Sequence, residues 1–193
     1  MTLLEGRGLG CSRGMAMLFR AVSFRVGAGE WLAVRGANGS GKTTLLRCAA
    51  GLSRPDAGEV LCDAELVYSG HLPGIKDDLS AEENLACALA LRGVRPEPGE
   101  VRSALAETGL ASRRQLPARR LSAGQRRRIG LARLMLDPAP LWILDEPLTA
   151  LDDDGRALFE RLLAAHLARG GAALVATHHD LAPSPARELR MGA

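Results

Sequence analysis

The feature that most constrains the fold is the glycine-rich run Gly36-Ala37-Asn38-Gly39-Ser40-Gly41-Lys42-Thr43, called the phosphate loop below. It matches the pattern G-x-x-x-x-G-K-[ST] in full. Its glycines let backbone N–H groups curl around phosphate oxygens, and a following helix presents its positive end to the same anion. An apolar run, Trp31 to Val34, precedes it, and a helical stretch follows it up to Gly51. This strand, loop and helix predict a protein that binds a nucleoside triphosphate.

Short apolar runs predict a parallel sheet. Residues 31–34, 141–144 and 172–176 are continuous apolar stretches bounded by Gly, Pro or Asp, which is typical of strands buried on both faces. Residues 21–26 alternate more and indicate an exposed antiparallel strand. Helices are expected from the Gly41 region to just before Gly51, which would be its C′ glycine, from about Gln125 to Leu136, and from about Arg156 to Arg169.

The middle of the chain has a different pattern. Between Gly74 and Arg128 it is mostly helical, with turns at 93–99 and at Gly109. Ser80 and Glu83 have the spacing of a capping box. We therefore expect one domain over residues 1–193, with a core of about 1–74 and 131–193 and an inserted helical subdomain of about 75–130.

Composition restricts the compartment and the role. The four cysteines form no C-x-x-C pair, so we expect small buried hydrophobic side chains in a reducing cytosolic compartment: Cys11, Cys48, Cys62 and Cys87. No apolar run approaches the roughly 18 to 20 residues of a membrane span, and no signal peptide is recognisable. We therefore expect that the chain is not itself a channel and that any role in transport would require separate membrane subunits.

Two further motifs carry chemistry. The apolar run 141–144 ends in Asp145-Glu146, which places one carboxylate beside the phosphate loop, where it could hold Mg²⁺, and a second where it could polarise a water. Leu121-Ser122-Ala123-Gly124-Gln125, called the signature segment below, combines a capping-box spacing with a glycine. It predicts a helix start and a second anion site.

Together these motifs resemble the nucleotide-binding subunits of ABC transporters. The resemblance rests on the phosphate loop, LSAGQ, Leu141 to Pro147, Ala150-Leu151-Asp152 and Ala176-Thr177-His178, in that order. It implies an α/β P-loop NTPase with a RecA-like parallel sheet core, an antiparallel β edge and an inserted helical subdomain. It also implies head-to-tail homodimers that bind ATP and Mg²⁺ between the phosphate loop of one copy and the signature segment of the other.

The motifs and the resemblance assign three groups of site residues. Catalytic roles fall to Glu146, His178 as the switch histidine, and Lys42. Mg²⁺ ligation falls to Thr43 and Asp145. Nucleotide binding falls to Gly36, Ala37, Asn38, Gly39, Ser40, Gly41, Lys42, Thr43, Thr44, Ser122, Gly124 and Gln125. Asp152 matches the family residue that runs along the dimer interface. No functional role is expected for His166 and His179.

A narrower resemblance lies in the run Tyr68-Ser69-Gly70-His71-Leu72-Pro73-Gly74-Ile75-Lys76. It is similar to the ATP-binding subunit of the haem exporter of cytochrome c maturation. That implies an ATP hydrolase on the cytoplasmic face of the bacterial inner membrane, peripherally attached through membrane-embedded partners and without nucleic acid. The alternatives are the ATPase of another ABC exporter, or a soluble ABC ATPase that acts on ribosomes or nucleic acid.

Three positions depart from the family pattern. His71 stands where most members have glutamine, and we interpret it as a residue that couples to the membrane partner. No aromatic residue stands within 9–14, where the family stacks adenine, so we hypothesise that the Arg13 guanidinium stacks there. The segment 61–66 is short, which indicates a trimmed β-hairpin at the antiparallel edge.

The positive charge is uneven although the net charge is only +3. Such a cluster is compatible with a solvated helix face, with an acidic partner or membrane surface, or with nucleic acid. The arginines in question are Arg113, Arg114, Arg119, Arg120, Arg126, Arg127 and Arg128.

Overall fold

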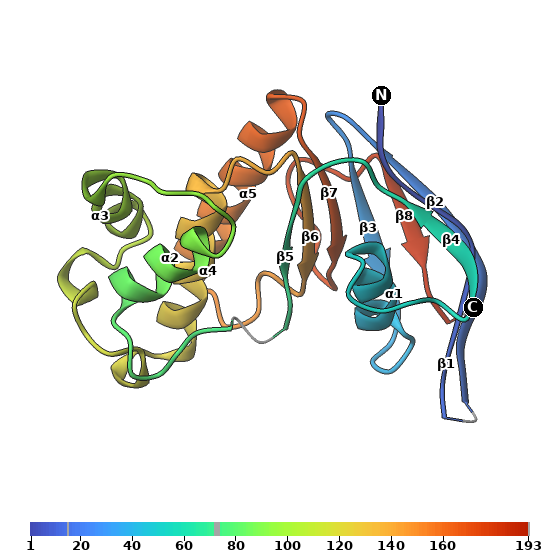
Figure 1. The fold of residues 1–193 in the computed structure, drawn as a ribbon, viewed down its shortest axis with the longest axis horizontal. Coiled ribbons are helices and arrows are strands. Elements are labelled where there is room, and N and C mark those ends of the chain that lie inside the picture. The colour runs from blue at the N-terminus through green and yellow to red at the C-terminus, as the bar shows by residue number, and fades with distance from the viewer. Residues whose placement is uncertain (15, 72–73, 193) are drawn as a thin grey trace. The chain divides into compact units, whose positions relative to one another are not determined.

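The structure is a computed structural model that describes residues 1–14, 16–71 and 74–192 (Figure 1). The chain divides into two compact units. Unit 1 comprises Met1–Gly70, Ala139–Pro147 and Leu163–Ala193, and unit 2 comprises His71–Pro138 and Leu148–Leu162. The expected boundaries of a core and a helical subdomain, near residues 74 and 131, stay a prediction.

Unit 1 contains a five-stranded parallel sheet in the order β5-β6-β7-β3-β8. Its strands are β3 (Trp31–Arg35), β5 (Leu66–Ser69), β6 (Leu141–Asp145), β7 (Ala172–Ala176) and β8 (Arg187–Arg190). The three predicted apolar strands are confirmed, and every residue of β6 and β7 is buried. Strands β5 and β8 were not predicted, because β5 is short and β8 reads Arg-Glu-Leu-Arg, which gives no apolar signal.

A second, antiparallel sheet of unit 1 has the order β2-β1-β4. It consists of β1 (Thr2–Arg13), β2 (Ala16–Gly27) and β4 (Ala57–Leu61). The strand predicted at 21–26 is confirmed as part of the longer β2. Despite the short segment 61–66, β4 pairs directly with β1, with Leu61 opposite Glu5. The antiparallel edge is therefore retained.

Helix α1 (Lys42–Ala49) lies between the two sheets (Figure 1). Its Leu45 and Leu46 belong to one buried cluster with Leu4 of β1 and Ile143 of β6. The helix ends as predicted at Gly51, whose φ of 70° suits a residue without Cβ. The Gly51 N–H donates to the carbonyl of Cys48 at 3.0 Å and the Leu52 N–H to that of Arg47 at 2.9 Å, which is a Schellman ending.

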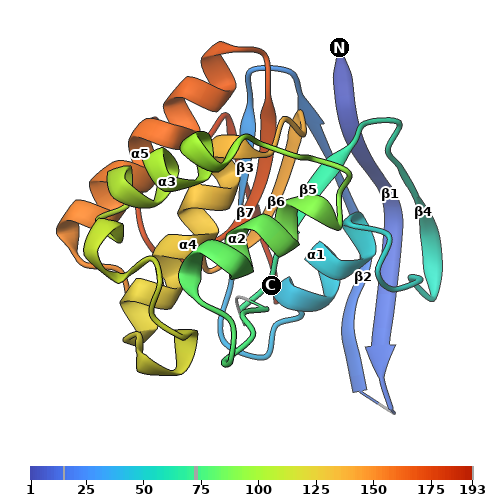
Figure 2. The same ribbon diagram turned by 60° about the vertical axis from the view of Figure 1, so that its left-hand side comes forward.

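Unit 2 is built from helices α2, α3 and α4, seen together in Figure 2, with two 3-10 turns and the first part of α5. Their bounds are α2 (Ala81–Ala90), α3 (Pro98–Glu107), η1 (Ala111–Arg113), η2 (Ala118–Arg120), α4 (Ala123–Leu136) and α5 (Asp153–Ala168). Leu85, Leu105 and Ile129 meet in its core. The capping box at Ser80 is confirmed. Helix α5 begins earlier than predicted, because Asp153 and Asp154 suit the positive end of a helix.

The cysteines follow the prediction only in part. Cys11 and Cys48 are buried, and burial raises the pKa of the Cys48 thiol to about 11. Cys62 is partly buried. The prediction is wrong for Cys87, which is exposed because the buried stripe of α2 runs through Ala81, Asn84, Leu85 and Leu89 and leaves position 87 on the outer side.

The imidazole of His166 is buried in unit 1. The His166 ring stacks on Trp142, with ring centroids 3.9 Å apart and an interplanar angle of 11°. Its Nε2 lies 3.2 Å from the carbonyl oxygen of Ala172, to which a protonated Nε2 would donate. Burial lowers the pKa of His166 below its ordinary 6.5. The folded state therefore favours the neutral imidazole.

We expect this histidine to make stability depend on pH. Because its folded pKa is depressed, its contribution is complete above the unfolded pKa of 6.5 and is lost as the pH falls towards the folded pKa. The free energy of unfolding should decline by up to about 1.4 kcal/mol per pH unit in that window. Urea unfolding at several pH values should show a smaller slope for His166→Phe, whereas His179→Phe should keep the parental slope. An unchanged slope in His166→Phe would contradict the assignment.

Candidate nucleotide site

The register of the parallel sheet brings three chain segments to one edge. Val34 of β3 lies opposite Ala176 of β7, and Asp145 of β6 lies opposite the same Ala176. The carboxyl ends of these strands therefore coincide, which is where α/β sheets bind ligands. The phosphate loop follows the first strand, Glu146 follows the second, and Thr177-His178 follows the third. All of these residues belong to unit 1.

The backbone of the phosphate loop leaves no room for side chains at two of its glycines. A Cβ on Gly36 would lie 2.6 Å from the carbonyl oxygen of Met191 and 2.7 Å from Ser40 Oγ. A Cβ on Gly41 would lie 2.9 Å from the Phe19 ring, and the φ of Gly41 is 93°. These two glycines are therefore required by packing as well as by access to phosphate.

The loop has donors suited to an anion. Lys42 is only 8% exposed, and its Nζ donates to the carbonyls of Gly36 at 2.6 Å and Ala37 at 3.1 Å. The N-cap residue of α1 is Gly41, which has no side chain to cap the helix. Within the described part of the chain, the buried Ser40 Oγ has no hydrogen-bond partner. A phosphate in the loop would satisfy these groups and the amides at the helix start.

A hydroxyl and a carboxylate meet beside the loop. Thr43 Oγ1 donates to Asp145 Oδ2 at 2.7 Å, and Asp145 is 2% exposed. Burial, and then the charge of Asp145, raise the pKa of the nearby Tyr68 phenol. Oxygen ligands of this kind are those that Mg²⁺ prefers. The residues present thus fit a nucleoside triphosphate with its magnesium ion.

Glu146 has an unusual backbone. Its φ is +48°, in the left-handed region that a non-glycine residue adopts at a cost of about 1–3 kcal/mol. Its N–H donates to the carbonyl of Ala176 at 2.9 Å, and its Oε1 lies 3.2 Å from His178 Nε2. The side chain of His178 is half-exposed and that of Glu146 mostly buried. Strain of this kind is concentrated at functional sites, and here it orients a carboxylate beside a histidine.

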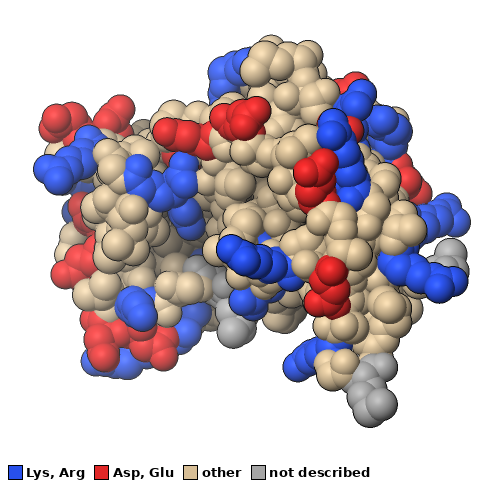
Figure 3. Space-filling view, turned by 45° about the vertical axis from the view of Figure 1, so that its right-hand side comes forward, with Lys and Arg blue, Asp and Glu red and all other residues tan. Residues whose placement is uncertain are grey.

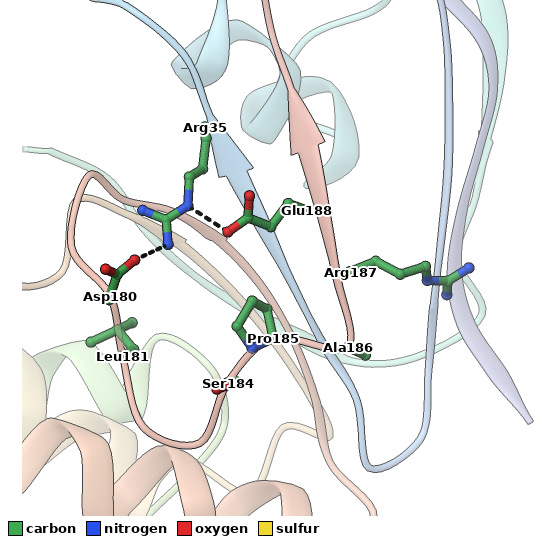
Figure 4. A pocket seen from close by; sticks show the side chains of 8 residues that line it. All are labelled: Arg35, Asp180, Leu181, Ser184, Pro185, Ala186, Arg187 and Glu188. Atoms are coloured by element: carbon green, nitrogen blue, oxygen red, sulfur yellow. Dashed lines mark hydrogen bonds and ion pairs between the residues drawn. The ribbon is translucent and has the colours of Figure 1, made fainter.

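The structure adds a residue that the sequence reasoning missed. Arg35 directly precedes the phosphate loop. Its guanidinium donates to Asp180 Oδ1 at 2.7 Å and to Glu188 Oε1 at 2.9 Å, and Figure 4 shows it between these two carboxylates. These three side chains border a cavity of about 460 Å³. The Arg35 carbonyl also accepts from the Met191 N–H at 2.7 Å. Arg35 thus ties the base of the loop to the segment after His178 and to β8.

The signature segment lies in unit 2 and caps α4 as predicted. The Gln125 N–H donates to Ser122 Oγ at 3.2 Å, and the Ser122 N–H donates to Gln125 Oε1 at 3.0 Å. A Cβ on Gly124 would lie 2.6 Å from the carbonyl oxygen of Ala150. These residues line a cavity of about 370 Å³ together with Gly109, Arg128, Ala150 and Asp152.

Asp152 is held at the wall of this cavity. Its Oδ1 accepts from the Gly155 N–H at 3.0 Å and from the Arg128 guanidinium. The backbone hydrogen bond from Gly155, followed by the side-chain hydrogen bond from Arg128, lowers the pKa of the Asp152 carboxyl. Arg128 was not among the predicted site residues, since nothing in its sequence context distinguishes it from the neighbouring arginines.

Two further predicted positions are exposed. His71 is exposed in unit 2, and the following Leu72 and Pro73, which carried part of the narrower resemblance, lie outside the described residues. Arg13 is exposed at the end of β1 in unit 1. The roles of both stay hypotheses.

An α/β protein that joins a phosphate loop, a buried strand ending in Asp-Glu and a histidine at one sheet edge is a phosphate-loop ATPase. The chain belongs to the ABC transporter family, whose model matches residues 19–149. It binds ATP and is an ATP hydrolase of that family. It is 50% identical over 190 residues to the "Cytochrome c biogenesis ATP-binding export protein CcmA" of Methylococcus capsulatus, a match that covers 92% of each chain.

Solved structures confirm the predicted fold class. An ABC transporter ATP-binding protein from Pyrococcus furiosus superposes with a TM-score of 0.85 at 22% identity, covering 97% of this chain and 96% of that one. The ATP-binding cassette MJ0796, bound to ADP and Pi, gives a TM-score of 0.84 at 20% identity and covers 97% and 94%. In the part of the chain that the structure describes, no helix is both long and apolar enough to cross a membrane.

Lys42→Ala should abolish a charge-assisted contact to phosphate. We expect ATP affinity to fall by about 10- to 100-fold, since hydrogen bonds to charged groups contribute about 1.5–3 kcal/mol. Turnover should fall with it. Fluorescent-nucleotide titration of the isolated chain measures the affinity. Lys76→Ala removes the same charge from an exposed site in unit 2 and should bind ATP like the parent. Equal affinities for the two variants would argue against the role of Lys42.

Proposed function

We propose that this chain is the ATP-hydrolysing subunit of a transporter complex for haem export in cytochrome c maturation. The observation that carries the proposal is the 50% identity, over 92% of both chains, to a protein named for cytochrome c biogenesis and export. The run from Tyr68 to Lys76 supports the same subgroup. The proposal favours this role over another exporter or a ribosome-associated ATPase.

The subunit would act at the cytoplasmic face of the bacterial inner membrane. It would attach peripherally, through membrane-embedded subunits of the same complex. The exposed His71 is proposed to sense those subunits. Its imidazole is shorter than the usual glutamine side chain.

Two copies are proposed to act together, head to tail. The cavity of unit 2 supports this, because it presents Ser122, Gly124 and Gln125 at a helix start, where a phosphate group can be bound. A structural relative, MJ0796, is described as dimeric in a post-hydrolysis state. In the proposed arrangement, ATP bound by the phosphate loop of one copy meets the signature segment of the other.

The proposed mechanism assigns each group a task. The loop residues 36–44 surround the phosphates, and Lys42 exchanges its two carbonyl contacts for phosphate oxygens. Thr43 and Asp145 would hold Mg²⁺, which neutralises phosphate charge when bound. Glu146 polarises the attacking water as general base. His178, 3.2 Å from Glu146 Oε1, orients that carboxylate and contacts the γ-phosphate.

Adenine would lie against the end of β1. Phe19 of the neighbouring strand β2 packs against the phosphate-loop glycine Gly41, so this hairpin borders the loop. Arg13, exposed on the same hairpin, offers a guanidinium plane for the base.

Glu146→Gln tests the catalytic assignment. The amide keeps the shape of the side chain and cannot accept the proton, so turnover should drop about 100-fold or more while ATP still binds. A stable ATP-dependent dimer should accumulate, which size-exclusion chromatography with light scattering would detect. Glu107→Gln, on the exposed end of α3, should hydrolyse ATP like the parent. Near-parental turnover in Glu146→Gln would refute the assignment of the base.

Cell fractionation tests the biological role. The chain should sediment with membranes only when the neighbouring membrane subunits are co-produced, and deletion of the gene should abolish holocytochrome c. Salt-sensitive binding to RNA, with no dependence on a membrane protein, would favour the ribosome-associated alternative instead.

A further inference from the structure

Three consecutive arginines follow the signature segment on α4, and together they contact the chain around His71 and Asp77, Thr108 and Asp152 in unit 2. Arg126 Nη1 lies 2.7 Å from Asp77 Oδ1. Arg127 Nη1 donates to the carbonyl of His71 at 3.5 Å. Arg128 pairs with Asp152 and donates to the Thr108 carbonyl at 2.8 Å. Since successive helix residues are about 100° apart, one turn of α4 reaches three segments at once.

These side chains are not a freely solvated surface. Arg127 is 6% exposed, and the side chains of Arg128 and Arg126 are 16% and 29% exposed. On the face drawn in Figure 3, basic side chains lie beside acidic ones instead of forming one continuous basic area. The three arginines therefore hold segments of unit 2 together and do not form a docking site for an acidic surface.

The segment contacted by Arg126 is itself rigidly held. Asn84 of α2 is buried and donates from Nδ2 to the carbonyls of Lys76, Leu79 and Ser80, at 2.9 to 3.1 Å. Its Oδ1 accepts from the Lys76 N–H at 2.8 Å. A displacement of the segment 76–80 would therefore be transmitted to α2 and, through Asp77, to α4.

We propose that Arg126, Arg127 and Arg128 are positioning residues that couple the chain around His71 to the signature segment and to Asp152. The inference rests on the proposed function, in which His71 faces the membrane partner. A movement imposed there would pull on α4 through Asp77 and the His71 carbonyl. It would shift the Ser122 end of the helix, and Arg128 would carry the same shift to Asp152.

The test reverses the charges of one ion pair, Arg126–Asp77. Arg126→Asp, Asp77→Arg and the double exchange are purified both alone and with their membrane subunits in nanodiscs. ATP turnover is then measured in each form. Each single variant should lose about 3- to 10-fold of the partner-stimulated rate, a range typical of residues that carry coupling. Basal turnover and the KM for ATP should stay within about twofold of the parent. The double exchange should recover at least half of the stimulation.

A matched control lies one residue further along the segment. Arg119 pairs with Asp78 at 2.5 Å, but it belongs to η2 and not to α4. Arg119→Asp and Asp78→Arg should therefore keep the stimulation. Equal losses in the control, equal losses of basal and stimulated rates, or a double exchange no better than its single variants would each overturn the proposal.

The response of the parent protein's ATP turnover to the membrane subunits distinguishes a failure of this inference from a failure of the proposed function. If membrane subunits do not stimulate the parent at all, both proposals fail, and the variants are not needed to show it. If the parent is stimulated and the charge exchanges have no effect, only the coupling role of the three arginines fails.

Discussion

The alignment of Val34, Ala176 and Asp145 in one row of the parallel sheet is the constraint on which the site depends. It fixes where three loops leave the sheet, and the hydrogen bond from Thr43 to Asp145 then joins two of them. Because β6 and β7 are fully buried, a shift of register by one residue would turn buried side chains to the opposite face of the sheet. The geometry of the nucleotide site is thus maintained by packing far from any phosphate.

Charged side chains link different parts of the chain in the two units. In unit 1, Arg35 links the base of the phosphate loop to the segment after His178 and to the last strand. In unit 2, the arginines after the signature segment hold three segments around one helix turn. Such pairs contribute little to stability when exposed, about 0–1 kcal/mol each. Their value lies in fixing the orientation of backbone segments that must move together.

The sequence was sufficient to predict a structural element where its residue pattern is compatible with only one local structure. The phosphate loop, the buried strand before Asp145 and the Ser122 cap each combine residue types with a spacing that few structures satisfy, and the structure has them where predicted. The short charged strand β8 and the contacts of Arg35 could not be foreseen, because their partners lie more than 140 residues away along the chain. Cys87 was misjudged because its exposure depends on which side of α2 the neighbouring helices cover.

Glu146 illustrates a conflict between folding and chemistry. In the left-handed region, a glycine or an asparagine would be accommodated more easily than a glutamate. The residue found there is therefore one that the local backbone disfavours. Substitutions that relieve the strain would stabilise the fold while removing the carboxylate, a trade-off between stability and activity. With Glu146 as the proposed general base, screens that select this protein for heat resistance alone would be drawn towards variants that lack that base.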